Sequence, residues 1–526
     1  MQLMRKLDLI RLQKTTITTR KSFVGKAMNG NAMNKVASKT LAQAIFMTLS
    51  AIILTTTMPV AAQHDHHDHH DHYDQLPDLG SNAARFLSDD KAQKIGESFI
   101  RQSRFQQPYV YDPELVDYIN RLGQRLLAVS DEADKEYNFH LINNNTINAF
   151  AVPGGQIALH TAILTKSESE SELASVIAHE ISHVTQRHIA RRIETQQYDQ
   201  WIAIGALLAA AAVGGAEGAQ AGFSVANASI VDRQLKYSRS FEAEADSLGI
   251  RLLSRAGFEP RAMADFFERL MKESRISESS APEFLRSHPL TVNRISEASA
   301  RINSYPPGGP QDENEFLLMQ AKTTALYAKD AALVRDLYKE KLDNGDQSLA
   351  TQYGYALALS KNSEYAAARR EFNKTLKEYP DNISARIAHA DNELEAGKIE
   401  RGLEMLKVLY KEQNQIDNHM IDIYYANALV LTGRNEEALP ILRSAIANNP
   451  DEPYFHSLLA RAYGELGEDF KSFVSRGEFH YQRGHYEFSL KQFRRANQLA
   501  ESDYDKARTR ARMNDIHHAI EELKSL

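Results

Sequence analysis

Two histidines four residues apart constrain this chain most, because they must share one face of a helix. The segment LASVIAHEISHVTQRHIARR, from Leu173 to Arg192, has apolar residues at helical spacing and predicts one helix. His179 and His183 therefore project the same way, with Glu180 between them. This HExxH pattern is typical of a zinc site, where two imidazoles one turn apart hold the metal and the carboxylate acts on a nearby water. The alternative is two helix-surface histidines beside a solvated glutamate.

Any further metal ligand must be His, Asp or Glu, because the chain has no cysteine. A hydrolytic zinc needs three protein ligands and one open position. The segment SRSFEAEADSLGIRLLSRAG predicts a second amphipathic helix, on which Glu242 and Asp246 lie four apart and share a face. Glu242 is the candidate third ligand, and Asp246 is the candidate acceptor for the free N–H of a ligand histidine. Glu244 points about 200° away from Glu242 and is expected to face away. From the residues alone, Glu242 could equally be a surface carboxylate.

Four separated motifs resemble a known family. In chain order they are NAFAVPGGQIALHTAIL (148–164), SELASVIAHEISH (171–183), FEAEAD (241–246) and SHPLTVNRI (287–295). Their order and spacing are similar to those of the gluzincin metallopeptidases, which include HtpX and the CaaX prenyl endopeptidase. With the leader and the repeats described below, the chain looks most like periplasmic members that carry C-terminal repeats.

The resemblance implies a zinc endopeptidase with one Zn²⁺ per chain, held by His179, His183 and Glu242. It makes Glu180 the general base and Asp246 the residue that orients a ligand histidine. His288 matches a histidine that can approach the metal and hold the enzyme inactive. Arg294 matches an arginine placed near bound substrate.

Extended substrates of varied sequence can pair by their backbone with an edge strand. Two alternating, β-rich runs, 149–152 and 156–160, flank a Pro-Gly-Gly turn, and either is a candidate edge. The residues expected to contact substrate are Asn148, Ala149, Phe150 and Ala151. Two other histidines, His160 and His188, are expected to be structural, since one lies in a predicted strand and the other is off the ligand face of a continuous helix.

The first 62 residues are predicted to be a signal peptide. Two lysines precede an apolar run at 41–60, and small residues lead to a cleavage site after Ala62. A retained transmembrane anchor is the competing interpretation, and Met33 is an alternative start. Removal of residues 1–62 takes away nine basic residues and one acidic residue, so the net charge moves from −7 to −15. Neither value suggests binding to nucleic acid.

A tract HDHHDHHDHYD follows within residues 63–85. Such a tail can chelate zinc, copper or nickel loosely, or it can be an inert disordered segment. We expect no catalytic role for it.

The apolar insert at 201–225 contains two overlapping GxxxG steps, which are typical of transmembrane dimers. One crossing would place His183 and Glu242 on opposite sides of a bilayer about 30 Å thick, although both must reach one zinc. Two crossings would need about 40 residues. We therefore expect a helical hairpin that acts as a lid over the site or contacts a membrane surface.

The C-terminal half is predicted to be an α-solenoid of tetratricopeptide repeats. Pairs of small residues twelve apart recur with steps of 34 and 36 residues, close to the period of this repeat. The pairs are Ala356 and Ala368, Ala390 and Gly402, Ala426 and Ala438, and Gly477 and Ser489. The last step is longer and indicates about half an atypical repeat, and 312–344 is expected to add a degenerate helix pair. A coincidental helical bundle is the alternative.

The predicted fold is mainly α (α+β): a helical zinc metallopeptidase domain with a small β-sheet at 86–305, and the repeats at 306–526. Three functions remain open. The first is a periplasmic endopeptidase and chaperone for misfolded outer-membrane proteins that works with the barrel-assembly machinery, as the resemblance implies. The second is a latent zinc-bound adaptor with little proteolysis, if His288 closes the metal site. The third, minor one is metal delivery by the His-rich tail.

Overall fold

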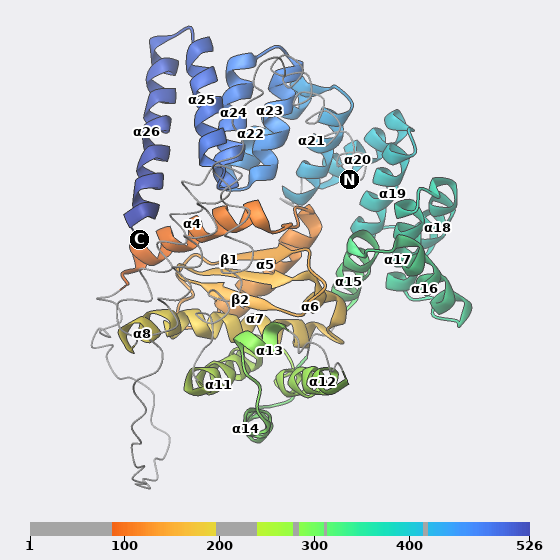
Figure 1. Ribbon diagram of the computed structural model, residues 1–526. Helices are drawn as coiled ribbons and strands as arrows, with labels where there is room; N and C mark the ends of the chain where they lie inside the picture. The colour runs from red at the N-terminus through yellow and green to blue at the C-terminus, as the bar shows by residue number, and fades with distance from the viewer. Residues whose placement is uncertain (1–86, 196–238, 277–282, 310–312, 414–418, 526) are drawn as a thin grey trace, which may run out of the picture. The chain divides into compact units, whose positions relative to one another are not determined.

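The computed structural model describes residues 87–195, 239–276, 283–309, 313–413 and 419–525 (Figure 1). The chain divides into two units, Met1–Leu79 and Gly80–Leu526, and all described residues belong to the second. The predicted signal peptide, the His-rich tail and the insert at 201–225 lie outside the described residues. Among the helices that are described, none is both long enough and apolar enough to cross a membrane.

The first part of the described chain combines helices with one small sheet. Its elements are α4 (Asp89–Gln106), α5 (Pro113–Leu127), β1 (Asn138–Ile142), β2 (Ala149–Val152), β3 (Gln156–His160), α6 (Thr161–Lys166), α7 (Glu170–Thr185), α8 (His188–Thr195), α11 (Arg239–Arg255), α12 (Ala262–Ile276), α13 (Glu283–Ser287) and α14 (Val292–Ile302). Figure 1 shows the sheet between α4 on one side and α7 on the other, with α11, α12 and α14 beyond α7.

The sheet has the order β1-β3-β2, so β3 lies in the centre. β1 runs parallel to β3 with Leu141 opposite Leu159, and β2 runs antiparallel to β3 with Phe150 opposite Ala158. All five residues of β3 are buried. The candidate edge at Gln156–His160 is therefore wrong, because both sides of that strand are already paired. β2 is the edge strand beside α7.

The predicted single helix over Leu173–Arg192 is also wrong, because the structure divides it into α7 and α8. Helix α7 begins after Ser169, whose hydroxyl accepts a hydrogen bond from the Glu172 N–H at 3.2 Å. The chain leaves the helical path at Arg187, which has a φ of 51°. A left-handed conformation is uncommon for a residue other than glycine and interrupts an α-helix. Helix α8 therefore takes a new direction from His188 onward.

Helix α11 packs closely on α7, and leaves room for Met263 of α12, because it has glycine at position 249. A Cβ built on Gly249 would lie 2.7 Å from Met263 Cε and 3.3 Å from the backbone nitrogen of His179. The absence of a side chain at this point lets the backbones of α7 and α11 approach. Glu242 and Asp246, on α11, consequently face the histidines of α7.

The repeat half consists of antiparallel helix pairs, which confirms the predicted solenoid. Its elements are α15 (Asn314–Tyr327), α16 (Ala331–Asp343), α17 (Leu349–Lys361), α18 (Tyr365–Glu378), α19 (Ile383–Glu395), α20 (Ile399–Gln413), α21 (His419–Leu431), α22 (Asn435–Asn448), α23 (Pro453–Glu465), α24 (Asp469–Gln482), α25 (Tyr486–Leu499) and α26 (Asp503–Ser525). The degenerate pair expected at 312–344 is α15 with α16.

The half repeat expected near the C-terminus is wrong, because α23 and α24 form a full pair there. Ala460 and Ser472 are its small residues, twelve apart, and the Ser472 hydroxyl donates to the Ala460 carbonyl at 2.8 Å. Ser472 follows Ala438 by 34 residues, so the period continues unbroken. The Ser489 hydroxyl donates in the same way to the Gly477 carbonyl at 2.7 Å, between α24 and α25. Because Gly477 and Ser489 are also twelve residues apart, the sequence pattern was mistaken for half of an extra repeat.

A buried ion cluster joins α5 to the repeats. The Lys322 ammonium, on α15, lies 2.8 Å from an Asp112 carboxylate oxygen and also bonds Glu114. The Tyr424 hydroxyl, on α21, lies 2.8 Å from Lys322 Nζ and 3.1 Å from Asp112 Oδ2. All three charged side chains are at most 5% exposed. The hydrophobic core is continuous across this contact, from α5 and α7 through α15 to α19.

We expect Lys322→Ala to lower the free energy of unfolding by about 3–5 kcal/mol, because it leaves two buried carboxylates without their cation. Urea unfolding of the full chain measures the change. The control is Lys329→Ala, which removes an exposed lysine of the next loop and should change the free energy by less than about 0.5 kcal/mol. Equal effects of the two substitutions would contradict a structural role for the cluster.

Candidate zinc site

Four buried side chains from three helical segments meet at one point. His179 and His183 come from α7, Glu242 from α11, and His288 from the residue after α13. One ligand atom of each lies within 4.8 Å of the others, and within the described part of the chain this is the group that could hold a metal ion. The structure thus brings the three predicted ligands together and adds the predicted latch histidine.

The donor atoms point inward at short range. His179 Nε2 lies 3.0 Å from His183 Nε2, and each of them is 3.5 Å from a Glu242 carboxylate oxygen. His288 Nδ1 is 3.2 Å from Glu242 and 3.3 Å from His179 Nε2. Imidazole nitrogen and carboxylate oxygen are ligands that zinc accepts, so the donor set fits that ion.

Glu180 is completely buried beside this group. Its carboxylate oxygens make no hydrogen bond of normal geometry with the described residues, although the Ala151 N–H is near enough to lower the pKa of this carboxyl. His288 Nε2 lies 3.4 Å from Glu180 Oε1. A buried carboxylate without hydrogen bonds is costly unless it has a function at that place. Burial raises the pKa of the Glu180 carboxyl, while His288 and His179 act in the opposite direction. A raised pKa suits a carboxylate that takes up a proton.

Burial and neighbouring charges shift the pKa values of the three predicted ligands. Burial alone would lower the pKa of His179, but Asp246 and Glu242 outweigh it and raise the pKa to about 9. Burial lowers the pKa of His183 well below its usual value. Burial would raise the pKa of Glu242, but His288, His179 and His183 hold it well below the usual range. The carboxylate is therefore ionised and able to bind a cation.

Arg294, on α14, is held by the two carboxylates of α11. Its Nε and Nη2 atoms lie 2.7 and 2.8 Å from the Asp246 carboxylate, and its Nη1 lies 2.9 Å from Glu242 Oε2. The guanidinium is buried and lies over the Phe267 ring. Asp246 in turn has a carboxylate oxygen 3.0 Å from His179 Nδ1, as expected for a residue that orients this histidine. In this structure Arg294 thus binds the site's own carboxylates.

The sequence did not predict the contacts that His188 and Glu244 make beside the metal group. Neither belongs to the metal group, as predicted, but His188 Nδ1 lies 2.7 Å from His183 Nδ1 and His188 Nε2 lies 3.2 Å from Glu244 Oε2. The prediction that His188 lies off the ligand face assumed a continuous helix, and the break at Arg187 overturns it. No glycine or proline in the sequence signalled that break. His160, the other histidine set aside, contacts Thr146 through Nδ1 and lies outside the group.

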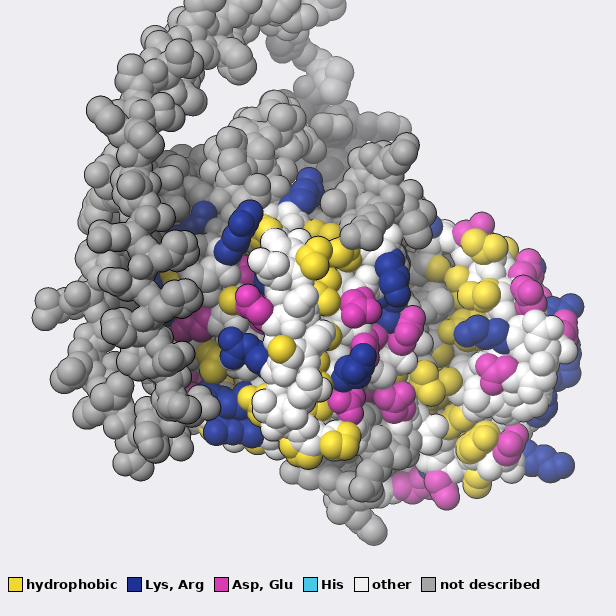
Figure 2. All heavy atoms as spheres, turned by 90° about the horizontal axis from the view of Figure 1, so that it is seen from below, with side chains coloured by type: hydrophobic (Ala, Val, Ile, Leu, Met, Phe, Trp, Pro, Cys, Tyr) yellow, Lys and Arg dark blue, Asp and Glu magenta, His cyan; other side chains and the backbone are white. Residues whose placement is uncertain are grey.

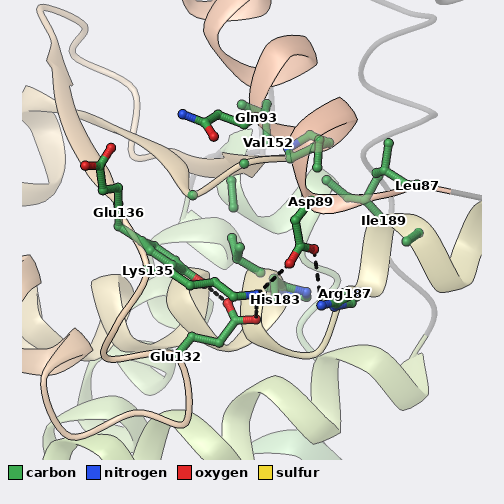
Figure 3. Close-up of a pocket in the computed structure, with 18 residues that line it drawn as sticks. Leu87, Asp89, Gln93, Glu132, Lys135, Glu136, Val152, His183, Arg187 and Ile189 are labelled. Carbon is green, nitrogen blue, oxygen red and sulfur yellow. Dashed lines mark hydrogen bonds and ion pairs between the residues drawn. The ribbon is translucent and has the colours of Figure 1, made fainter. Parts of the chain in front are cut away.

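A cavity of about 300 Å³ adjoins the site on the side of His183 (Figure 3). Ala151 and Val152 of β2 and His183 form part of its wall. Ion pairs cross its rim: Asp89 lies 3.2 Å from both Lys135 and Arg187, and Lys135 lies 2.6 Å from Glu132. The cavity is therefore lined both by the edge strand β2 and by α7, which carries two predicted ligands.

The opposite face of the site is covered. Figure 2 shows the face on which α11, α12 and α14 lie, where acidic, basic and hydrophobic side chains mix and no histidine is visible among the residues that are coloured. The described histidines of the metal group are each at most 1% exposed.

The comparisons with known proteins agree with this geometry. Residues 113–302 match the model of peptidase family M48, and residues 393–462 match a tetratricopeptide repeat model. The beta-barrel assembly-enhancing protease of Escherichia coli is 34% identical over 459 residues, which are 85% of this chain and 92% of that protein. The protein of the same name from Yersinia pestis is 34% identical over 436 residues, or 82% and 88% of the two chains.

This chain belongs to the family of beta-barrel assembly-enhancing proteases. It is a metalloprotease of the zinc-dependent M48 type. A more distant relative, the mitochondrial metalloendopeptidase OMA1 of Schizosaccharomyces pombe, is 33% identical over 179 residues, which are 34% of this chain and 50% of that protein. The resemblance predicted from the four sequence motifs is thereby confirmed. The part played by each site residue stays a prediction.

We expect Glu242→Ala, made together with His288→Ala, to abolish tight zinc binding, because His179 and His183 alone do not complete a three-ligand site. Metal analysis after gel filtration should find about one zinc per chain in the unaltered protein and far less in the variant. Glu297→Ala, on an exposed face of α14, is the control and should retain zinc. Full zinc content in the Glu242→Ala/His288→Ala variant would exclude Glu242 as a ligand.

Proposed function

We propose that this protein is a periplasmic zinc endopeptidase that degrades misassembled outer-membrane β-barrel proteins or assists their assembly. The single observation that carries the catalytic part is the buried group of His179, His183 and Glu242 with the unbonded Glu180 beside it. The name of the full-length relatives supports β-barrel proteins as clients. The predicted signal peptide and the absence of cysteine fit an oxidising compartment outside the cytoplasm.

One Zn²⁺ per chain would be held by His179, His183 and Glu242. When bound, zinc supplies a Lewis acid that polarises the scissile carbonyl and lowers the pKa of a water. Glu180 accepts the proton from the attacking water and passes it to the leaving amine. Its burial and its raised pKa favour this transfer, because the protonated form is not strongly disfavoured. Asp246 holds the His179 ring in place through Nδ1.

The substrate backbone would pair with the open edge of β2, formed by Asn148, Ala149, Phe150 and Ala151. The His160 N–H donates to the Asn148 carbonyl at 2.9 Å, so these residues form a hydrogen-bonded pair of the ladder. Bonded and non-bonded pairs alternate in an antiparallel ladder. The N–H and C=O groups of Ala149 and Ala151 therefore point away from β3, toward the open edge. The Ala151 N–H also lowers the pKa of Glu180, which supports a substrate edge beside the proposed general base.

The cavity next to β2 would accommodate a substrate side chain. In an extended chain paired with Ala151, successive side chains point to opposite faces of the sheet. The cavity begins at Ala151 and Val152 and has a largely apolar lining, which suits the hydrophobic residues that unfolded proteins expose.

The structure also supports a latent form of the enzyme. The Phe284 N–H, on α13, donates to the Ile147 carbonyl at 3.0 Å, so α13 lies at the start of the substrate edge. His288 follows α13 and lies among the ligands. As a fourth ligand it would fill the position that a hydrolytic zinc needs for water. We propose that α13 with His288 must withdraw before hydrolysis, with Arg294 then available to bind substrate.

The second candidate is an adaptor in which zinc stays closed and the repeats alone bind clients. His288 in the metal group is the observation that favours it. The repeats form a surface for protein partners, and we propose outer-membrane proteins and the barrel-assembly machinery as those partners. The insert at 201–225 stays a proposed lid or peripheral membrane contact.

Casein hydrolysis by Glu180→Gln and His288→Ala separates these candidates. We expect Glu180→Gln to bind zinc but to lose at least about 10²-fold in kcat, because it removes the general base. We expect His288→Ala to be more active than the unaltered protein. Chelator should abolish all activity. Hydrolysis that survives Glu180→Gln would exclude the proposed mechanism, and inactivity of every form would favour the adaptor.

Ala151→Pro tests the substrate edge. Proline removes an N–H that the β2–β3 ladder does not use, so zinc content should stay unchanged. The same N–H also acts on Glu180, and the pH dependence of kcat separates an effect on that carboxyl from an effect on substrate pairing. We expect kcat/KM for an extended peptide to fall about tenfold, as for one lost hydrogen bond of about 1.4 kcal/mol, mostly through KM. Ala151→Ser retains the N–H and should retain activity. A proline variant with unaltered KM would mean that substrate does not pair with Ala151.

A further inference from the structure

The two histidines of α7 are held at Nδ1 in different ways. His179 Nδ1 lies 3.0 Å from Asp246 Oδ1, a direct contact with a carboxylate of α11. His183 Nδ1 lies 2.7 Å from another imidazole nitrogen, His188 Nδ1, and this ring leads to a second carboxylate. The second carboxylate is Glu244, whose Oε2 lies 3.2 Å from His188 Nε2. At Nδ1, both ligand histidines therefore connect to α11, His179 directly and His183 through His188.

Chemistry decides the order of protons along His183, His188 and Glu244. A metal ligand must present an unprotonated Nε2, so neutral His183 carries its hydrogen on Nδ1. That N–H donates to His188 Nδ1, which must then be the acceptor. His188 consequently carries its hydrogen on Nε2 and donates it to the Glu244 carboxylate. The reverse order would put a proton on His183 Nε2, which faces His179 Nε2 at 3.0 Å, where the metal must bind.

His188 and Glu244 are fixed by their surroundings. The His188 ring is fully buried and stacks on Phe241 with ring centroids 4.5 Å apart and an angle of 13°. Arg191 Nη1 binds Glu244 Oε2 at 2.9 Å, and its guanidinium lies over the same phenylalanine ring. The left-handed Arg187 turns His188 back toward His183. The backbone break at Arg187 and the stack on Phe241 thus hold His188 Nδ1 next to His183, a predicted zinc ligand.

We propose that His188 and Glu244 are positioning residues for His183, which set its tautomer and ring orientation and so increase the affinity for zinc. The proposal rests on the proposed role of His183 as a ligand. Groups that hold the free nitrogen of a metal-bound histidine typically change metal affinity by 10–100-fold. Glu244, which does not reach the metal, thereby acquires a role in the site through His188.

The test compares His188→Phe with His188→Asn in the full mature chain. Phenylalanine keeps the ring stack and the volume but cannot accept from His183. Asparagine loses the stack but can place Oδ1 where Nδ1 was and accept that hydrogen bond. The measurement is zinc affinity by competition with a fluorescent chelator, together with the visible spectrum of the cobalt-substituted protein. We expect His188→Phe to bind zinc 10–100-fold more weakly, and His188→Asn to recover most of that loss.

The opposite ranking, with phenylalanine better than asparagine, would show that His188 only fills space and would overturn the proposal, as would unaltered zinc affinity in both. Glu244→Ala provides a variant on a half-exposed side chain that leaves the core intact, and we expect it to weaken zinc binding about tenfold. His140→Phe, in β1, controls for loss of a partly buried imidazole and should bind zinc normally. Unaltered affinity in Glu244→Ala would remove Glu244 from the proposal. Because affinity and spectrum do not depend on turnover, they separate this proposal from the casein test of the proposed function.

Discussion

The close contact between α7 and α11 is the constraint on which the rest of the site depends. Helix α7 supplies the two histidines and Glu180, the proposed general base, and among the described residues α11 supplies Glu242, Asp246 and Glu244, the carboxylates that contact or are proposed to orient them. Gly249 makes the contact possible, because a side chain there would meet Met263 and the backbone of His179. Buried carboxylates are costly in isolation. Arg294 offsets that cost by binding both Glu242 and Asp246.

The same logic of buried, paired charge holds the repeats to the first part of the chain. Lys322 on α15 is surrounded by Asp112, Glu114 and Tyr424, which belong to elements far apart in the sequence. The hydrophobic core continues through this contact. The change from peptidase to repeats near 305 is therefore a change in the type of element within a continuous core. The domain boundary at that residue stays a prediction.

Access to the site depends on two small features of the sheet and its neighbours. β2 is left with an open edge because β3 takes the central position, and Ala149 and Ala151 direct their backbone groups to that edge. Helix α13 meets the same edge at Ile147 and carries His288 into the metal group. Under the proposed function, substrate binding and inhibition would thus compete at one place.

The sequence by itself determined the features that depend on spacing within one helix. His179, Glu180 and His183 had to share a face, and so did Glu242 and Asp246, because side chains four apart always do. The period of 34 residues similarly determined the helix pairs. The exception is the pair that contains Ala460 and Ser472, because Gly477 and Ser489 have the same spacing and were taken for the repeat pair.

Only the tertiary structure decided which strand is the edge and where His188 points. Both depend on contacts between different segments of the chain. β2 is an edge strand because β3 lies between β1 and β2 in the sheet. Arg187, in its left-handed conformation, forms an ion pair with Asp89 of α4. Local propensity carries no signal of either. The helical period placed Glu244 away from the metal correctly, but the break after α7 is what connects Glu244 to a ligand through His188.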